Sequence, residues 1–212
     1  MTQLGLNSAS SEYADNFVAH SDRLRDLYDN AVLLGAPALS PGICATLTFV
    51  ARSVDAKAVV VIGADNGLSG LSLYSGMHPG GILTTIGTES DWQEDARAAY
   101  VGQGISDNRI RLIAGEPLEV LPKLRDAAYD LVFIQGNKLE YVEYVAQAER
   151  LLRPGGVVAL NSALWQNLVA DEDNEDDETV IIREALQYVV ESEQFTPTLI
   201  PLGDGLLLAA HN

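Results

Sequence analysis

Cysteine is almost missing from this sequence: its 212 residues include only Cys44. A single cysteine cannot form a disulfide within the chain, and a catalytic thiol would need a partner base that the sequence does not indicate. We therefore expect Cys44 to be a small, buried, apolar side chain on a helix.

Basic residues are also scarce. The chain has 13 Lys and Arg against 30 Asp and Glu, which gives a formal net charge of −17. Proteins that bind nucleic acids neutralise phosphates with clustered Lys and Arg, and here the basic residues are scattered. We therefore expect no nucleic-acid partner, and small molecules are the better candidates.

Long apolar runs are missing as well. No run approaches the roughly 20 residues that a membrane span needs. The first ten residues lack the charged-then-apolar pattern of a signal peptide. We therefore expect a cytoplasmic protein with no membrane partner. A hydrophobic content of 47% is ample for the core of one α/β domain with a short extension.

Helical patterns dominate the first 55 residues. We expect helices over residues 11–20 and 22–34, the second with Ser21 as its cap and Gly35 as its end. A third helix should begin at Ser40-Pro41, where a capping residue precedes a first-turn proline. Residues 1–55 are thus a helical extension of a core over residues 56–212, within a single domain.

Strand and helix patterns alternate from residue 58 onward. Ala58–Ile62 is a continuous β-branched run, typical of a parallel strand buried on both faces. We expect further strands at 82–86, 110–113, 131–134, 157–160, 198–202 and 206–210. We expect helices at 68–77, from Ser90 with Gln93 completing a capping box, and at 118–121, 139–152 and 178–193. The pattern predicts an α/β, Rossmann-like, doubly wound sheet of seven strands, closed by an antiparallel C-terminal hairpin at its edge.

The loop after the first predicted strand is Gly63-Ala64-Asp65-Asn66-Gly67. Ligands of open α/β sheets bind outside the carboxyl ends of the strands. Dinucleotide enzymes use G-x-G-x-x-G, which lets a pyrophosphate rest on a helix N-terminus. Here the spacing is G-x-x-x-G, and the Asp65 carboxylate would repel a pyrophosphate. The loop favours S-adenosylmethionine, a sulfonium cation, over NAD, although Gly63 and Gly67 could also serve turn geometry alone.

Several longer motifs are shared with a known family. They are Ser40-Pro41-Gly42, residues 61–69, residues 130–138 with Tyr141 and Tyr144, and residues 151–156, 161–165 and 203–205. Through them the chain resembles bacterial S-adenosylmethionine-dependent O-methyltransferases related to catechol and caffeoyl-coenzyme A O-methyltransferases, most like the actinobacterial branch. The resemblance implies a class I methyltransferase fold, methyl transfer to a small-molecule hydroxyl, and a homodimer formed by the opening helices.

The resemblance also implies site residues. The expected cofactor contacts are Gly63, Ala64, Asp65, Gly67, Ser69, Glu89, Gly115, Glu116, Pro117 and Gln135. Glu89 would replace the ribose-binding acid that the family has where Gly87 stands. Ser40 and Trp165 are expected acceptor contacts, and Trp92 could line the adenine site or pack at its rim. Lys138 stands where the family has its catalytic base, although a lysine that opens a helix can also be merely solvated.

The family's metal site is altered in this chain. The family has an aspartate where Gln135 stands and an Asp-Asn pair where Asn161-Ser162 stands. Hard divalent cations prefer anionic oxygen ligands, and these three side chains are neutral. We therefore expect no divalent metal, and methyl transfer to an acidic acceptor such as a phenol or a carboxylate.

Two rival functions stay open. The lost metal ligands and ribose acid fit a non-catalytic relative that acts as a ligand-binding or dimerisation module. An NAD-dependent oxidoreductase is disfavoured by the loop spacing. Two other features are read as solvent-exposed: the dispersed His20, His78 and His211, and residues 171–178, whose seven carboxylates suggest a solvated flap.

Overall fold

The structure, a computed structural model, describes residues 8–33 and 38–212. A seven-stranded sheet lies at its centre in the order β3-β2-β1-β4-β5-β7-β6. The strands are β1 (Ala58–Ile62), β2 (Ile82–Gly87), β3 (Ile110–Ala114), β4 (Tyr129–Ile134), β5 (Leu152–Asn161), β6 (Phe195–Ile200) and β7 (Leu206–His211). β1 to β5 pair in parallel, and β7 is antiparallel to both of its neighbours.

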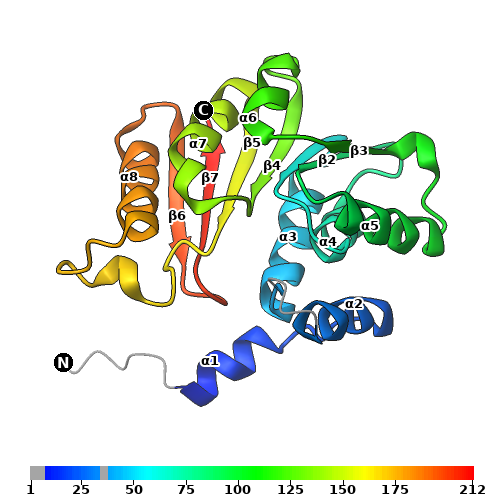
Figure 1. Cartoon of the computed structure of the whole chain (residues 1–212), viewed down its shortest axis with the longest axis horizontal. Coiled ribbons are helices and arrows are strands. Elements are labelled where there is room, and N and C mark those ends of the chain that lie inside the picture. The colour runs from blue at the N-terminus through cyan, green and yellow to red at the C-terminus, as the bar shows by residue number, and fades with distance from the viewer. Residues whose placement is uncertain (1–7, 34–37) are drawn as a thin grey trace.

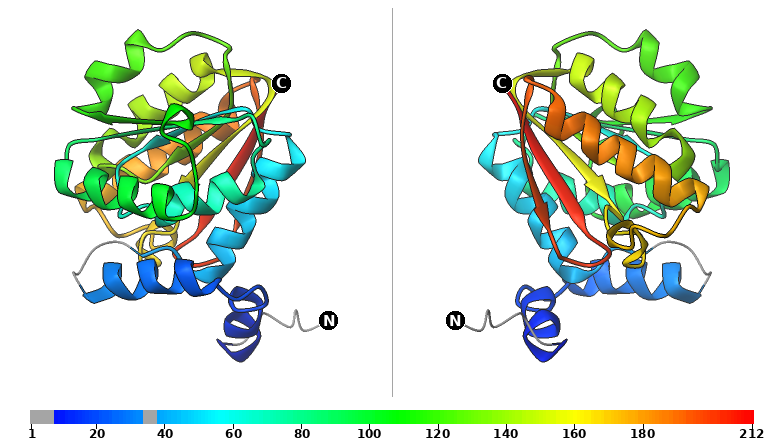
Figure 2. Two further views of the ribbon diagram at one scale, coloured as in Figure 1. Left: turned by 90° about the vertical axis from the view of Figure 1, so that its right-hand side faces the viewer. Right: turned by 90° about the vertical axis from the view of Figure 1, so that its left-hand side faces the viewer.

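Helices cover both faces of the sheet (Figure 1). One layer holds α3 (Pro41–Ser53), α4 (Leu68–Gly76) and α5 (Ser90–Gly102), and the other holds α6 (Pro117–Val120), α7 (Tyr141–Leu151) and α8 (Asp177–Glu191). Four 3₁₀ turns are η1 (Asp107–Arg109), η2 (Leu121–Lys123), η3 (Lys138–Glu140) and η4 (Leu168–Ala170). The opening helices α1 (Ser8–Asp15) and α2 (Asp22–Leu33) lie beyond the end of the sheet where the β6–β7 hairpin turns (Figure 2).

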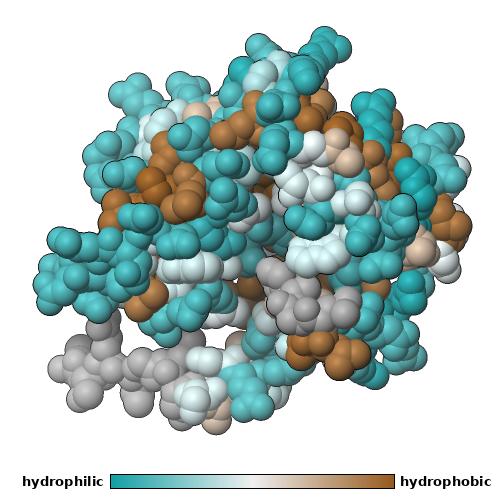
Figure 3. Space-filling model, viewed as in Figure 1, coloured by the Kyte–Doolittle hydropathy of each residue, from teal (hydrophilic) through white to brown (hydrophobic). Residues whose placement is uncertain are grey.

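Alternation along β1 divides the core into two clusters. Val59 and Val61 pack with α3, α4 and α5, while Val60 and Ile62 pack with α7 and α8. All four are fully buried, as a strand covered on both faces requires. The sheet is therefore a rigid support for the loops that follow its parallel strands. Most of the surface drawn in Figure 3 is hydrophilic, in keeping with the net charge of −17.

The predicted fold is confirmed, including β1 at its predicted bounds and the Ser40 cap of α3, whose Oγ accepts a hydrogen bond from Ile43 N. The antiparallel C-terminal hairpin lies at the edge of the sheet, as predicted. The antiparallel strand β7 lies between β5 and β6, so the edge strand β6 runs parallel to β5. The first helix ends at Asp15 rather than at residue 20, and Gly35 lies outside the described residues.

The predicted capping box of α5 is wrong. The N-cap is Glu89, and its side chain makes no capping hydrogen bond. Gln93 is buried, and its Nε2 donates to the carbonyl oxygens of Gly87 at 3.0 Å and Ile113 at 2.8 Å. Gln93 therefore satisfies backbone groups of β2 and β3 instead of the helix end.

The fifth strand begins earlier than predicted. β5 starts at Leu152, so residues 153–156, which lie between the predicted helix and the predicted strand, belong to the strand, with an irregular register opposite β4. The Arg153 side chain reaches across to Asp130 Oδ1 at 2.5 Å and the carbonyl oxygen of Val54 at 3.2 Å. These contacts hold the segment on the sheet.

Two further predictions concern Cys44 and the acidic segment. Cys44 is buried on α3, as predicted, and burial raises the pKa of its thiol to about 12, which keeps it protonated. The segment 171–178 is mostly exposed, as expected, and hydrogen bonds to its backbone fix its start. Arg183 of α8 donates to the carbonyl oxygens of Leu168, Val169, Asp171 and Asn174.

Candidate active site

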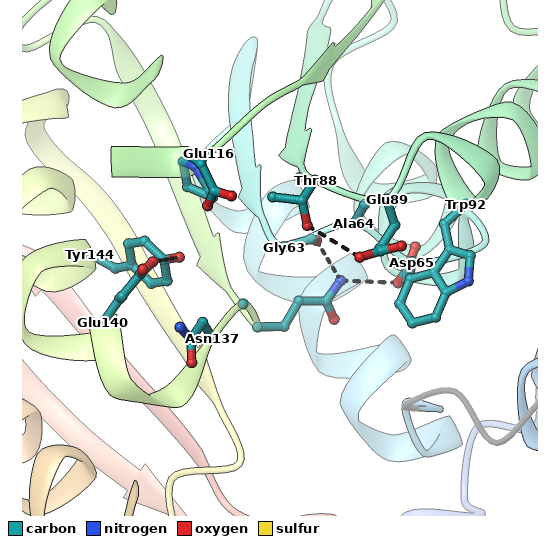
Figure 4. A pocket seen from close by; sticks show the side chains of 14 residues that line it. Gly63, Ala64, Asp65, Thr88, Glu89, Trp92, Glu116, Asn137, Glu140 and Tyr144 are labelled. Carbon is teal, nitrogen blue, oxygen red and sulfur yellow. Dashed lines mark hydrogen bonds between the residues drawn. The ribbon is translucent and has the colours of Figure 1, made fainter. Parts of the chain in front are cut away.

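A cavity of about 300 Å³ opens beyond the carboxyl ends of β1, β2 and β4 (Figure 4). It is lined by Gly63, Ala64, Asp65, Gly87, Thr88, Glu89, Trp92, Glu116, Pro117, Gln135, Gly136, Asn137, Glu140 and Tyr144. Four of these are carboxylates, and no Lys, Arg or His is among the described residues of the lining. A cavity lined by negatively charged side chains and no positively charged ones attracts a cationic ligand and repels a phosphate.

Gly63 allows the glycine loop to lie against the loop after β4. Its φ is +96°, and a Cβ there would come within 2.6 Å of both Gly136 Cα and Gly136 N. Only glycine fits such a backbone at such a distance. Gly67 also has a positive φ of +100°, and it faces α5 at Ala96 rather than the cavity.

The Asp65 carboxylate is held by the start of α4. Its Oδ1 accepts from Gly67 N at 2.8 Å, and its Oδ2 accepts from Ser69 N at 2.9 Å. Gln135 Nε2 adds hydrogen bonds to Asp65 Oδ2, Ser69 Oγ and the Gly63 carbonyl, each at 3.1 Å. Asp65 and Gln135 thus line the cavity, and their contacts to the cofactor stay predictions. Gly67 and Ser69 lie behind them and support the loop.

Acidic and aromatic side chains follow β2 and β3. In Figure 4, Glu89 and Trp92 lie close to Asp65, and Glu116 lies across the cavity from them. Glu89 is exposed, and its carboxylate accepts a hydrogen bond from Thr88 Oγ1 at 3.4 Å. The lining therefore includes Trp92. Gly115 is not part of the lining, and its N–H donates to the Gly87 carbonyl at 3.0 Å.

Glu140 and Tyr144 form a wall that the sequence analysis did not assign to the cofactor site. Tyr144 is almost fully buried, and its hydroxyl donates to Glu140 Oε2. Burial and the adjacent Glu140 carboxylate both raise the pKa of Tyr144, so this phenol stays protonated. The spacing of four residues, which places two side chains on one helical face, was the available signal.

Lys138 lies between two aromatic rings. Its Nζ is 4.8 Å from the centre of the Tyr141 ring and 5.6 Å from that of Trp165, and it donates to the Gly136 carbonyl at 3.3 Å. Burial lowers the pKa of Lys138 to about 8, and the Asp204 charge acts in the opposite direction. This lysine is partly desolvated, which argues against the merely solvated alternative.

The segment that carries Trp165 has an unusual backbone. Ser162, Trp165, Gln166 and Asn167 have φ values of +53°, +44°, +55° and +68°. Such conformations cost about 1 kcal/mol or more each in a non-glycine residue, persist only where the surroundings hold them, and cluster at functional sites. This strain is hard to predict from the residue types, because only asparagine among these four favours the left-handed region.

Ser40, the other expected acceptor contact, is the N-cap residue of α3. Its hydroxyl donates to Asp15 Oδ1 at 2.6 Å and caps α3. A Cβ on Gly203 would lie 3.4 Å from Ser40 Oγ, so the start of α3 borders the β6–β7 hairpin. A contact between Ser40 and the acceptor stays a prediction.

The positions of the family's metal ligands offer only neutral groups. Gln135 turns its amide nitrogen toward Asp65, and the backbone of Ser162 is left-handed. Asn161 is buried, and its Oδ1 has no hydrogen-bond partner within residues 8–33 and 38–212. No group of three or more His, Cys, Asp or Glu that could hold a metal occurs in those ranges. This donor set does not fit a hard divalent cation.

His20, His78 and His211 are partly buried rather than fully exposed, and none lines the cavity. Among the helices described, none is both long and apolar enough to cross a membrane.

The strand order, with β7 inserted antiparallel between β5 and β6, and the cavity above the glycine loop define a class I methyltransferase fold. The family model described as O-methyltransferase matches residues 28–212. A protein of Mycobacterium sp. (strain JLS) with a provisional O-methyltransferase assignment is 41% identical over 206 residues, which cover 94% of each chain. The chain belongs to the O-methyltransferase family.

Solved structures agree with this assignment. A protein of Corynebacterium glutamicum superposes with a TM-score of 0.87 at 29% identity, with 94% of each chain covered. The O-methyltransferase TomG of Streptomyces achromogenes, which is involved in tomaymycin synthesis, was solved in complex with S-adenosylmethionine. It superposes with a TM-score of 0.86 at 26% identity, over 100% of this chain and 99% of TomG.

Proposed function

We propose that this protein uses S-adenosylmethionine to methylate a hydroxyl group of a small molecule, a phenol or a carboxylic acid, without a divalent metal. The observation that carries the proposal is the partly desolvated Lys138 between Tyr141 and Trp165, three residues after Gln135 of the acidic cavity. The TomG complex with S-adenosylmethionine supports the choice of cofactor.

The cavity residues fit this cofactor. Glu89 is available to bind the ribose hydroxyls, because a carboxylate makes strong charge-assisted hydrogen bonds to a diol. Glu116 and Pro117 border the adenine side, and Trp92 offers an aromatic face. The loop of Gly63 and Asp65 accommodates the positively charged end. When bound, S-adenosylmethionine supplies a methyl group on a sulfonium, which is open to in-line attack.

Lys138 is the proposed base. With the cofactor bound, Lys138 Nζ would accept the hydroxyl proton of a phenol acceptor, whereas a carboxylic acid is already ionised near pH 7 and would need no base. With a pKa of about 8, about a tenth of Lys138 is neutral at pH 7. The family's metal positions hold Gln135, Asn161 and Ser162, so an acidic acceptor and the lysine must together provide the deprotonation.

We further propose a cytoplasmic homodimer. Tyr13, Phe17 and Phe49, near the opening helices, are each at least 70% exposed, and exposed apolar residues of this size suit a protein interface. A chain with one cysteine suits a reducing compartment.

The test is methyl transfer from labelled S-adenosylmethionine to a panel of phenols and carboxylic acids, in the presence of EDTA. We expect cofactor binding by calorimetry and product formation without metal. Cofactor binding with no product from any acceptor would favour the non-catalytic module. Activity that EDTA abolishes and Mg²⁺ restores would contradict metal independence.

A further inference from the structure

We infer that Asp204 is a positioning residue of the acceptor site, which holds in place the left-handed segment of Trp165, whose ring centre lies 5.6 Å from Lys138 Nζ. This inference builds on the proposed function of Lys138. Asp204 lies in the turn between β6 and β7, far in sequence from Lys138 and Trp165.

Hydrogen bonds from the hairpin hold the backbone on both sides of Trp165. The Asp204 carbonyl accepts from Leu164 N at 2.9 Å, and the Asp204 Oδ1 accepts from Gln166 N at 2.5 Å. The carbonyl of the next residue, Gly205, accepts from Ala163 N at 3.0 Å. These bonds supply the support that a left-handed Trp165 and Gln166 require.

Gly205 makes this close approach possible. Its φ is +85°, and a Cβ on it would lie 2.5 Å from Leu164 Cγ and 2.6 Å from Leu164 N. Any other residue would push the hairpin away from the segment. The Gly203-Asp204-Gly205 turn therefore does more than connect β6 to β7. It also packs against the segment that carries Trp165.

Asp204 is the described carboxylate whose charge acts on Lys138. Within the described ranges Lys138 has no ion pair shorter than 4.0 Å, and the Asp204 charge raises the pKa of Lys138 against the larger effect of burial. Glu140 of the same turn is bound to the Tyr144 hydroxyl. Asp177 and Glu178 lie at the start of α8, which packs on η3. The negative charge of Asp204 favours the ammonium form and so offsets part of the effect of burial.

Two variants separate the roles of Asp204. Asp204→Asn removes the charge but keeps an oxygen that can accept from Gln166 N, whereas Asp204→Ala removes both. Asp107→Asn is the matched control, because it deletes one carboxylate at an exposed ion pair with Arg97. We expect the pKa of Lys138 to fall by about 1 unit in both Asp204 variants and to stay unchanged in the control.

The measurement is an NMR titration of lysine-labelled protein without cofactor or acceptor. The sequence has three lysines, Lys57, Lys123 and Lys138, so Lys138→Arg assigns the signal. Trp165 emission is followed in parallel in a Trp92→Phe background, which leaves a single tryptophan. We expect the emission to shift in Asp204→Ala and to be retained in Asp204→Asn.

An unchanged Lys138 titration in Asp204→Asn would overturn the inference, as would identical Trp165 emission in Asp204→Ala and wild type. Neither measurement depends on catalysis. If the wild-type protein transfers no methyl group while the Lys138 titration shifts as expected, the proposed function fails and the influence of the Asp204 charge on Lys138 stands.

Discussion

The side-chain amide nitrogen of Gln135 donates a hydrogen bond to Asp65 Oδ2 at 3.1 Å, which joins the loop after β4 to the loop after β1. In the resembled family this β4 position holds an anionic metal ligand. Here the same position stabilises the glycine loop of the cofactor cavity, because a neutral amide can donate to a carboxylate where a second carboxylate would repel it.

Gln135→Leu should therefore loosen the glycine loop. It removes hydrogen bonds to Asp65, Ser69 and Gly63, with an expected loss of about 1–3 kcal/mol in the free energy of unfolding. We also expect weaker S-adenosylmethionine binding by calorimetry. Gln103→Leu, at an exposed helix end, is the control and should change neither quantity. Wild-type stability and affinity in Gln135→Leu would show that the bridge is dispensable.

Gly63→Ala should abolish cofactor binding. Its Cβ would collide with the Gly136 backbone, in addition to about 1–2 kcal/mol for a positive φ. Gly104→Ala is a matched control, because Gly104 has a φ of +75° and an added Cβ would meet nothing within 4 Å. We expect Gly104→Ala to lose stability in urea unfolding yet bind the cofactor normally. Equal binding by both variants would refute the argument from close approach.

Glu89→Ala should weaken cofactor binding about 10- to 100-fold, the scale of one or two charge-assisted hydrogen bonds. Glu94→Ala, at an exposed position of α5, removes the same charge outside the cavity and should have little effect. Calorimetry on the two variants distinguishes a ribose contact from a general loss of negative charge. An unchanged affinity in Glu89→Ala would exclude Glu89 as the substitute for the missing ribose acid.

Lys138→Met should lower the rate of methyl transfer about 10²- to 10⁴-fold, the usual range for a general base. The affinity for S-adenosylmethionine should stay within about twofold of the wild type, because Lys138 does not line the cofactor cavity. Lys123→Met serves as the control. Single-turnover rates at saturating cofactor measure the effect, and wild-type rates in Lys138→Met would remove the lysine from the mechanism.

The order of the strands and helices could be predicted because a strand that is buried on both faces of the sheet is a continuous apolar run in the sequence. Ala58–Ile62 has the apolar run of a central strand, and Ser40-Pro41 has the chemistry of a helix start. The early start of β5 could not be predicted in this way, because it depends on Arg153 reaching Asp130 in another strand.

The residues adjacent to strand ends are the ones that the sequence could bring together. Gly63, Asp65, Glu89, Glu116 and Gln135 all line the cavity, and their contacts to the cofactor stay predictions. Two missed features depend on tertiary contacts: the left-handed backbone around Trp165 and its support from Asp204. No local pattern records such contacts, since each partner comes from a different loop or turn.

The central claim is metal-free methyl transfer with Lys138 as the base, and the pH dependence of kcat/KM in EDTA tests it most directly. Lys138 must be neutral to accept a proton, so the rate should rise about tenfold per pH unit below pH 8 and level off above it. This rise should disappear in Lys138→Met. A wild-type rate that is flat between pH 6 and 9, or a rise that persists in Lys138→Met, would contradict the account.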